Sequence, residues 1–281
     1  MKYVAKYVEE TENTSEPAEF SYAIRVIFRV ILAVFAVYLA LGIIVDVAVP
    51  YIPPAWEDSL AEPIMREVFT TGQESKRFQV AEIQQLLDSL AGLMVGTRRK
   101  FYISVLEKNE TNALALPGGH IVVYSQLLEK VSSENELAMI LAHELGHFAA
   151  RDHLRGLGRS FLFFIVANFA LGGQSDSVRQ FMNSSGILQN NYSRQQEFAA
   201  DKYALELLVK KYGHAGGATD FFKRLAEEET LPQLVHYLST HPASERRVTV
   251  LNQLISDNSY TIGQASPVFW TETEKAEQDD N

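Results

Sequence analysis

Residues 133–150 read SENELAMILAHELGHFAA. This stretch begins with a helix-capping pattern, in which Ser133 precedes Glu136 by three positions. Apolar residues then recur at the spacing that places them on one face of a helix. We therefore expect a single helix here that continues through Ala149 and Ala150.

The second half of this helix contains the pattern H-E-x-x-H at residues 143–147. His143 and His147 are four residues apart, so both imidazoles point from the same face and can share a tetrahedral Zn²⁺ ion. Glu144 lies beside them, where a carboxylate can take a proton from water. The pattern predicts half of a metal-dependent active site, because zinc in such sites usually has three protein ligands.

Two residues compete for the place of the third ligand. His153 lies six residues beyond the second histidine, but position 150 is Ala rather than the Gly that lets a helix stop and turn back. Glu197 begins a capped helix and lies one turn before Asp201, which could accept a hydrogen bond from the outer nitrogen of a ligating histidine. The plainer alternatives are a surface imidazole at His153 and a solvated carboxylate pair at Glu197 and Asp201.

Composition and charge exclude several classes of function. The chain has 281 residues, of which 47% are hydrophobic, and 25 Lys and Arg against 35 Asp and Glu give a net charge of −10. An acidic chain without a basic tract is a poor partner for nucleic acid. Because the chain has no cysteine, disulfides, thiolate metal sites and a cysteine nucleophile are excluded, and His and carboxylates must hold any metal.

An uncharged apolar run at residues 30–45, extended on both sides, predicts a retained transmembrane anchor over residues 23–49. Lys2, Lys6, Arg25 and Arg29 precede the run, whereas residues 46–65 contain no Lys or Arg. This bias places the N-terminus in the cytoplasm and the bulk of the chain outside it. In a Gram-negative cell the domain would be periplasmic.

The remainder of the sequence predicts a mainly α fold with a small β-sheet. Residues 80–93 have apolar side chains at helical spacing, and 101–106, 113–116 and 121–124 are typical of strands. We expect a cytoplasmic tail at 1–22, the anchor at 23–49, a catalytic domain at 50–262 and an acidic flexible tail at 263–281.

A second apolar stretch at residues 161–171 is too short to span a bilayer alone. It predicts a buried core helix or, alternatively, a helix at the membrane face of the domain. The polar stretch that follows, residues 174–191, is long for a connecting loop and could cover a site.

Four sequence blocks resemble the membrane-associated zinc metallopeptidases that include the CaaX prenyl endopeptidase, HtpX, BepA and the mitochondrial Oma-type protease. They are NALALPGGHI at 112–121, HELGH at 143–147, EFAAD at 197–201 and THPASERRV at 240–248. Together they extend from about residue 78 to about residue 255. The single predicted span resembles the Oma-type and periplasmic members more closely than the members with several spans.

The resemblance implies a zincin-like domain with one zinc ion held by His143, His147 and Glu197, with Glu144 as general base. It also implies that His241 and Arg247 approach the substrate carbonyl, or that His241 occupies the open metal position at rest. An edge strand would bind extended peptide substrates through its backbone; its residues are Asn112, Ala113, Leu114, Ala115 and Leu116.

These observations favour a membrane-anchored zinc endopeptidase that acts on proteins or peptides in envelope quality control. The alternatives are a chaperone-like assembly factor on the same fold, and a membrane-anchored scaffold in which H-E-x-x-H is accidental. Glu144 favours the enzyme, because a binder has no need of a base beside the metal. The oligomeric state and the natural substrate are not predicted.

Overall fold

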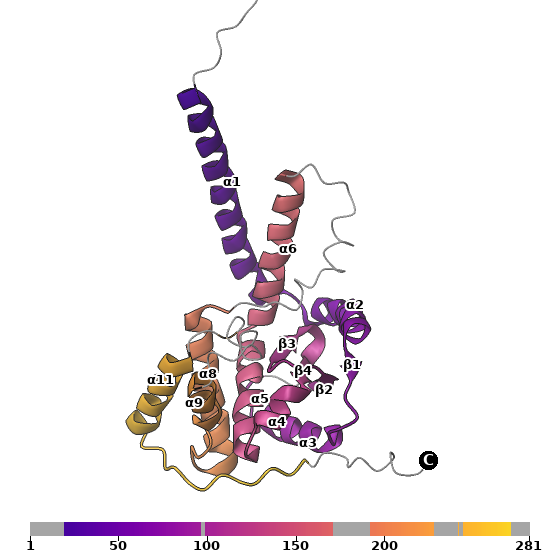
Figure 1. Ribbon diagram of the computed structural model, residues 1–281, viewed down its shortest axis with the longest axis vertical. Coiled ribbons are helices and arrows are strands. Elements are labelled where there is room, and N and C mark those ends of the chain that lie inside the picture. Colours follow the sequence, from indigo (N-terminus) through magenta and orange to yellow (C-terminus); the bar gives the residue numbers. More distant parts are fainter. Residues whose placement is uncertain (1–19, 97–98, 171–191, 228–240, 242–243, 271–281) are drawn as a thin grey trace, which may run out of the picture.

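The computed structural model describes residues 20–96, 99–170, 192–227, 241 and 244–270. This part of the chain is mostly helical with one small mixed sheet, as predicted, and a long N-terminal helix projects from the domain (Figure 1). The helices that surround the sheet are α2 (Pro54–Thr71), α3 (Val80–Ala91), α4 (Ser125–Lys130), α5 (Glu134–Ala149), α6 (Asp152–Ala170), α8 (Arg194–Tyr212), α9 (Asp220–Glu227) and α11 (Ser244–Asp257).

The sheet has four strands in the order β1-β2-β4-β3, with bounds Gln73–Glu74, Tyr102–Glu107, His120–Tyr124 and Ala113–Leu116 in that order. Strands β2 and β4 are parallel, whereas β3 pairs antiparallel with β4, with Leu114 opposite Val122. Within the described residues β3 therefore forms one edge of the sheet. The tight connection from β3 to β4 is the 3₁₀ turn η2 (Pro117–Gly119), where Gly118 and Gly119 have φ of 82° and 85°.

Side chains of the strands alternate between two apolar layers. One layer joins residues such as Val105, Ala115 and Ile121 to α3, α5 and α8. The other joins Leu114 and Val122 to α2 and to Leu157, Phe161 and Phe164 of α6. Helices on both faces bury the sheet, and all four residues of β3 are at most 4% exposed.

The predicted N-terminal anchor is a continuous helix, α1 (Phe20–Ala48), followed by the short 3₁₀ turn η1 (Val49–Tyr51). Ser21–Tyr51 is long and apolar enough to cross a membrane, with a mean hydropathy of 2.7. None of its most apolar window is buried in the domain. The helix begins three residues before the predicted boundary at residue 23.

Helix α5 does not continue as predicted. It ends at Ala149, and Arg151 adopts a left-handed conformation with φ of 57° before α6 begins at Asp152. Arg151 donates hydrogen bonds to the carbonyl oxygens of Val49 and Ile52, at 2.9 and 2.6 Å. These contacts with the end of the anchor hold the break between α5 and α6.

Two further expectations differ from the structure. Phe163 and Ile165 of α6 are 63% and 39% exposed, so the interpretation of 161–171 as a buried core helix is wrong for this face.

Residues 263–270 contact the domain rather than starting a flexible tail. The carbonyl of Ser266 accepts a hydrogen bond from the backbone N–H of Glu134, and Trp270 is 4% exposed. The proposed cover at 174–191 lies outside the described residues.

Candidate metal centre

Helix α5 positions His143 and His147 on its buried face, and both side chains are inaccessible to solvent. The helix is capped by Ser133, whose hydroxyl accepts a hydrogen bond from the backbone N–H of Glu136. The ring centroids of the two histidines are 4.7 Å apart, and their Nε2 atoms are separated by 3.1 Å. The motif therefore presents two ligand atoms toward one point, as its helical spacing predicts.

Helix α8 crosses α5 closely enough to bring Glu197 to the same point. Gly146 permits this approach, because a Cβ atom at that position would lie 3.0 Å from the Cα atom of Ala200. The carboxylate oxygens of Glu197 lie 3.5 Å from Nε2 of His143 and 3.3 Å from Nε2 of His147. The start of α8 has the complete capping box expected at Ser193.

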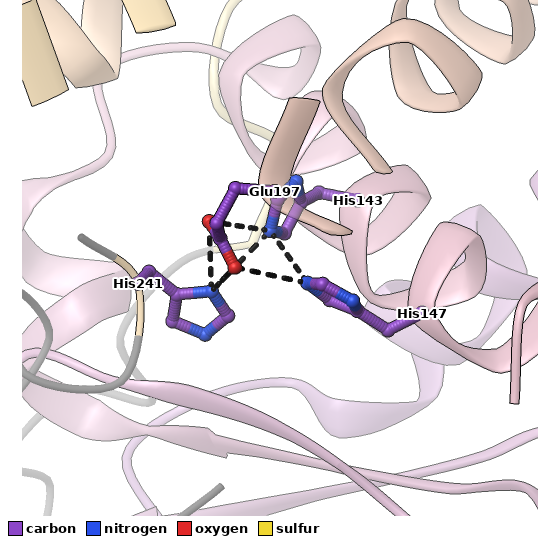
Figure 2. A group of neighbouring side chains, drawn as sticks. All are labelled: His143, His147, Glu197 and His241. Atoms are coloured by element: carbon purple, nitrogen blue, oxygen red, sulfur yellow. Dashed lines mark hydrogen bonds and ion pairs between the residues drawn. The ribbon is translucent and has the colours of Figure 1, made fainter. Parts of the chain in front are cut away.

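A fourth side chain, His241, completes the group. Its Nδ1 atom lies 3.1 Å from Glu197 Oε1 and 3.3 Å from His143 Nε2 (Figure 2). One ligand atom from each of His143, His147, Glu197 and His241 lies within 4.8 Å of the other three, and all four residues are buried.

These four side chains fit a metal ion. Ligands of a tetrahedral zinc ion stand about 2.0–2.2 Å from it and therefore about 3.3–3.6 Å from one another. Five separations between ligand atoms of the group are 3.1–3.5 Å, close to that spacing, and the whole group lies within 4.8 Å. Imidazole and carboxylate are also the donor types that the absence of cysteine leaves for a metal.

The outer nitrogen of each motif histidine faces a carboxylate. Nδ1 of His143 lies 2.9 Å from Asp201, as expected from the sequence, and Nδ1 of His147 lies 3.1 Å from Asp152. Asp152 also accepts a hydrogen bond of 2.7 Å from the side chain of Gln196. Sequence patterns do not identify Asp152, because its place depends on the break between α5 and α6.

Arg247 lies beneath the group and is fully buried. Its guanidinium donates to both carboxylate oxygens of Asp201, at 2.8 and 2.6 Å, and Nη1 lies 3.0 Å from Glu197 Oε2. It also stacks over the ring of Phe222, 4.2 Å from the centroid. The neighbouring Arg246 is exposed.

These contacts determine the charges of the centre. Burial raises the pKa of Glu197 and Asp201, but electrostatic interactions lower it by more, chiefly with His241 for Glu197 and with Arg247 for Asp201. The pKa of Glu197 is well below its usual range, and that of Asp201 falls to about 2. Both carboxylates are therefore ionised at neutral pH, as binding of a cation requires.

Glu144 is also buried, with 1% exposure. Neither of its carboxylate oxygens has a hydrogen-bond partner within the described part of the chain, and Oε1 lies 3.8 Å from Nε2 of His241. A buried carboxylate without a hydrogen-bond partner lowers the stability of the fold. Its presence here therefore favours a functional role.

His153, the other candidate ligand, lies outside the group. It is neither a surface imidazole nor a metal ligand by position: it is 1% exposed, and its Nε2 atom lies 3.1 Å from Glu57 of α2. Glu57 in turn pairs with Arg99 and accepts a hydrogen bond from the backbone of Gly118.

Tyr192, which sequence patterns did not single out, stacks on the ring of His147 with centroids 3.7 Å apart.

The predicted substrate strand packs directly on α5, since Ala113 and Ala115 share its apolar layer. Asn112 precedes the strand and is fully buried. Its carbonyl accepts a hydrogen bond from Tyr124, which extends the pairing of β3 with β4 by one residue.

Comparison with known proteins agrees with this site. Residues 78–255 match peptidase family M48. The chain is 27% identical over 164 residues to the mitochondrial metalloendopeptidase OMA1 of Schizosaccharomyces pombe, covering 56% of this chain and 48% of that protein. For OMA1 of Bos taurus the identity is 31% over 173 residues, covering 54% and 32%. For metalloprotease YcaL of Escherichia coli it is 28% over 154 residues, covering 53% and 60%. The alignments thus cover less than two thirds of each of these relatives.

Proposed function

The chain belongs to peptidase family M48, and from this membership we propose that it is a zinc-dependent endopeptidase held at a membrane by α1. The observation that carries the proposal is the buried group of His143, His147 and Glu197, with the carboxylate of Glu144 beside it. The domain would have a zincin-like arrangement, in which one helix supplies two ligands and the base.

In this proposal His143, His147 and Glu197 hold one zinc ion. When bound, zinc supplies Lewis acidity, which polarises a carbonyl group and lowers the pKa of water. Glu144 accepts the proton of the attacking water at a carboxylate oxygen and later delivers it to the leaving amine. Asp201 and Asp152 hold the rings of the two histidines in the tautomer that directs Nε2 at the metal.

Arg247 and His241 have different proposed roles. The guanidinium of Arg247 contacts Asp201 and Glu197, which favours a role in holding these carboxylates. Nδ1 of His241 lies among the ligand atoms, so His241 would occupy the open metal position at rest and leave it when substrate enters. The other role that the resemblance implies for His241, donation to the carbonyl oxygen during attack, predicts the opposite effect of removing it.

The proposed substrates are extended segments of proteins or peptides. An edge strand can align such a segment antiparallel to itself through backbone hydrogen bonds, with little demand on sequence. The residues that would do so are Asn112, Ala113, Leu114, Ala115 and Leu116. The similarity to metalloendopeptidase OMA1 supports cleavage within chains.

We propose that the N-terminus is cytoplasmic and the domain extracytoplasmic, because Lys2, Lys6, Arg25 and Arg29 precede the uncharged run at residues 30–45 and residues 46–65 contain no Lys or Arg. A role in quality control of envelope proteins is consistent with this location.

The experiment compares the wild type with Glu144→Gln and Glu197→Gln in the full chain, measuring bound metal and cleavage of casein. Glu144→Gln should keep the metal and lose cleavage, whereas Glu197→Gln should lose both. Glu62→Gln, on the exposed face of α2, is the matched control. Full cleavage by Glu144→Gln would refute the mechanism, and a wild type that binds metal without cleaving would favour an assembly factor.

A further inference from the structure

The second half of α6 lies beside the anchor (Figure 1), with Phe161 and Phe164 packed on the apolar layer between the sheet and α2 and with Phe163 and Ile165 exposed. Asp152, Arg155 and Arg159 are the charged residues of this helix, and residues 160–170 contain none. Eleven helical residues extend about 16 Å, roughly half of a hydrocarbon core of about 30 Å. This segment is therefore the right length to enter one leaflet without crossing the bilayer.

The two helices contact each other along a defined face of α1. Tyr38, Leu41, Gly42 and Val45 are half-buried, while most other residues of α1 are exposed. These four positions follow the i, i+3, i+4, i+7 spacing of one helical face. Tyr38 meets Phe163 edge to face, with ring centroids 6.3 Å apart.

The closest approach occurs at Gly158 of α6. A Cβ atom there would lie 2.8 Å from a methyl group of Val45, so only glycine allows the helices to pack this closely. Small residues at such crossings are typical of helix pairs in membranes.

An ionic contact marks where both helices leave the domain. Asp46, the last charged residue of α1, pairs with Arg159 at 2.5 Å and faces Arg155 at 3.9 Å. Arg159 is the last charged residue of α6. Beyond this level both helices run without charge, since α1 has none between Arg29 and Asp46.

Phe163 and Ile165 extend the exposed apolar surface of α1. Phe163 is 63% exposed, comparable to Ile43 and Ile44 of α1 at 63% and 59%. The face of α6 that carries Phe163 and Ile165 continues the surface of the membrane-spanning helix α1. The acyl chains that surround α1 would therefore also contact this face.

We propose that the second half of α6 is embedded beside α1 in the lipid leaflet that faces the domain, so that two helices rather than one attach the domain to the bilayer. The proposal rests on the membrane anchoring of α1 and is independent of metal binding and proteolysis. The partner of this surface is the acyl chains of phospholipids.

The test uses the absence of native cysteine. Single-cysteine variants Phe163→Cys and Ile165→Cys of the full chain carry a nitroxide label in phosphatidylcholine–phosphatidylglycerol vesicles. Collision with oxygen and with a water-soluble nickel chelate is measured for each. Phe35→Cys in α1 is the reference for lipid, and Lys202→Cys on the exposed side of α8 is the reference for water.

The ratio of oxygen to nickel collision at positions 163 and 165 should be several-fold higher than at 202 and close to the ratio at 35. A ratio equal to that at 202 at both positions would overturn the proposal, as would low access to both reagents, which would indicate a protein partner. An aqueous ratio at position 35 would instead refute the anchoring of α1, so the two failures are distinguishable.

Discussion

Replacing Arg247 by methionine keeps most of the volume of the side chain and removes a fully buried guanidinium. The structure assigns this group two hydrogen bonds to Asp201 and an ion pair with Glu197. Both carboxylates are buried and ionised, so the variant leaves them without this cation. Breaking a buried ion pair from one side costs about 3–5 kcal/mol, and we expect that loss in the free energy of unfolding of the metal-free protein.

The assay is urea unfolding of the full chain in detergent with a chelator present, followed by the fluorescence of the buried Trp270. Arg246→Met is the matched control, since Arg246 is exposed and only stacks at 5.5 Å over Phe198. It should cost less than about 1 kcal/mol. Adding Asp201→Asn to Arg247→Met should restore part of the loss, with a coupling of about 1–3 kcal/mol.

Equal stability of Arg247→Met and Arg246→Met would refute this reasoning. If Arg247→Met kept its stability and metal but cleaved slowly with unchanged KM, Arg247 would act on the transition state, as the family resemblance implies.

Three other predictions concern single side chains. Asp152→Asn should weaken zinc affinity by about 10–100-fold, measured by competition with a chelator, because the ring of His147 loses the negative charge of its acceptor; unchanged affinity would contradict this. His241→Ala should keep the metal and raise casein cleavage, because Nδ1 lies among the ligand atoms, whereas a fall would make His241 a catalyst. Glu57→Gln should lower the free energy of unfolding at pH 7 by about 1–3 kcal/mol. Although burial opposes it, contact with His153 and Arg99 holds the pKa of Glu57 below 4.5. Ionised Glu57 therefore stabilises the fold above that pH, and wild type and variant should converge as the pH falls through the lowered pKa; a constant difference would contradict this assignment.

Much of the centre could be predicted because its signals are local. Caps at Ser133 and Ser193 mark the starts of α5 and α8, and helical spacing then determines which faces carry His143, His147 and Glu197. Their convergence could not be derived from either helix alone. It depends on the close crossing at Gly146, which is a tertiary contact.

The errors arose where distant segments determine the local conformation. Nothing in the residues around Arg151 predicts its left-handed backbone, because the carbonyls that hold it belong to Val49 and Ile52. The positions of Asp152 and His153 follow from that break. For α6, an apolar segment of this length has the same pattern whether protein or lipid covers it, so periodicity could not predict the exposure of Phe163.

Arg151, Asp152 and His153 are consecutive, yet they contact three separate parts of the protein: the end of the anchor, the ring of His147 and Glu57 of α2. These contacts consequently fix the length of the chain in this short stretch. One residue inserted or deleted there would displace the three side chains relative to their partners, and the three contacts could not all be re-formed. We therefore expect natural or engineered versions of this chain to have no insertion or deletion between His147 and Arg159. Substitutions that keep the length of this segment are a separate matter.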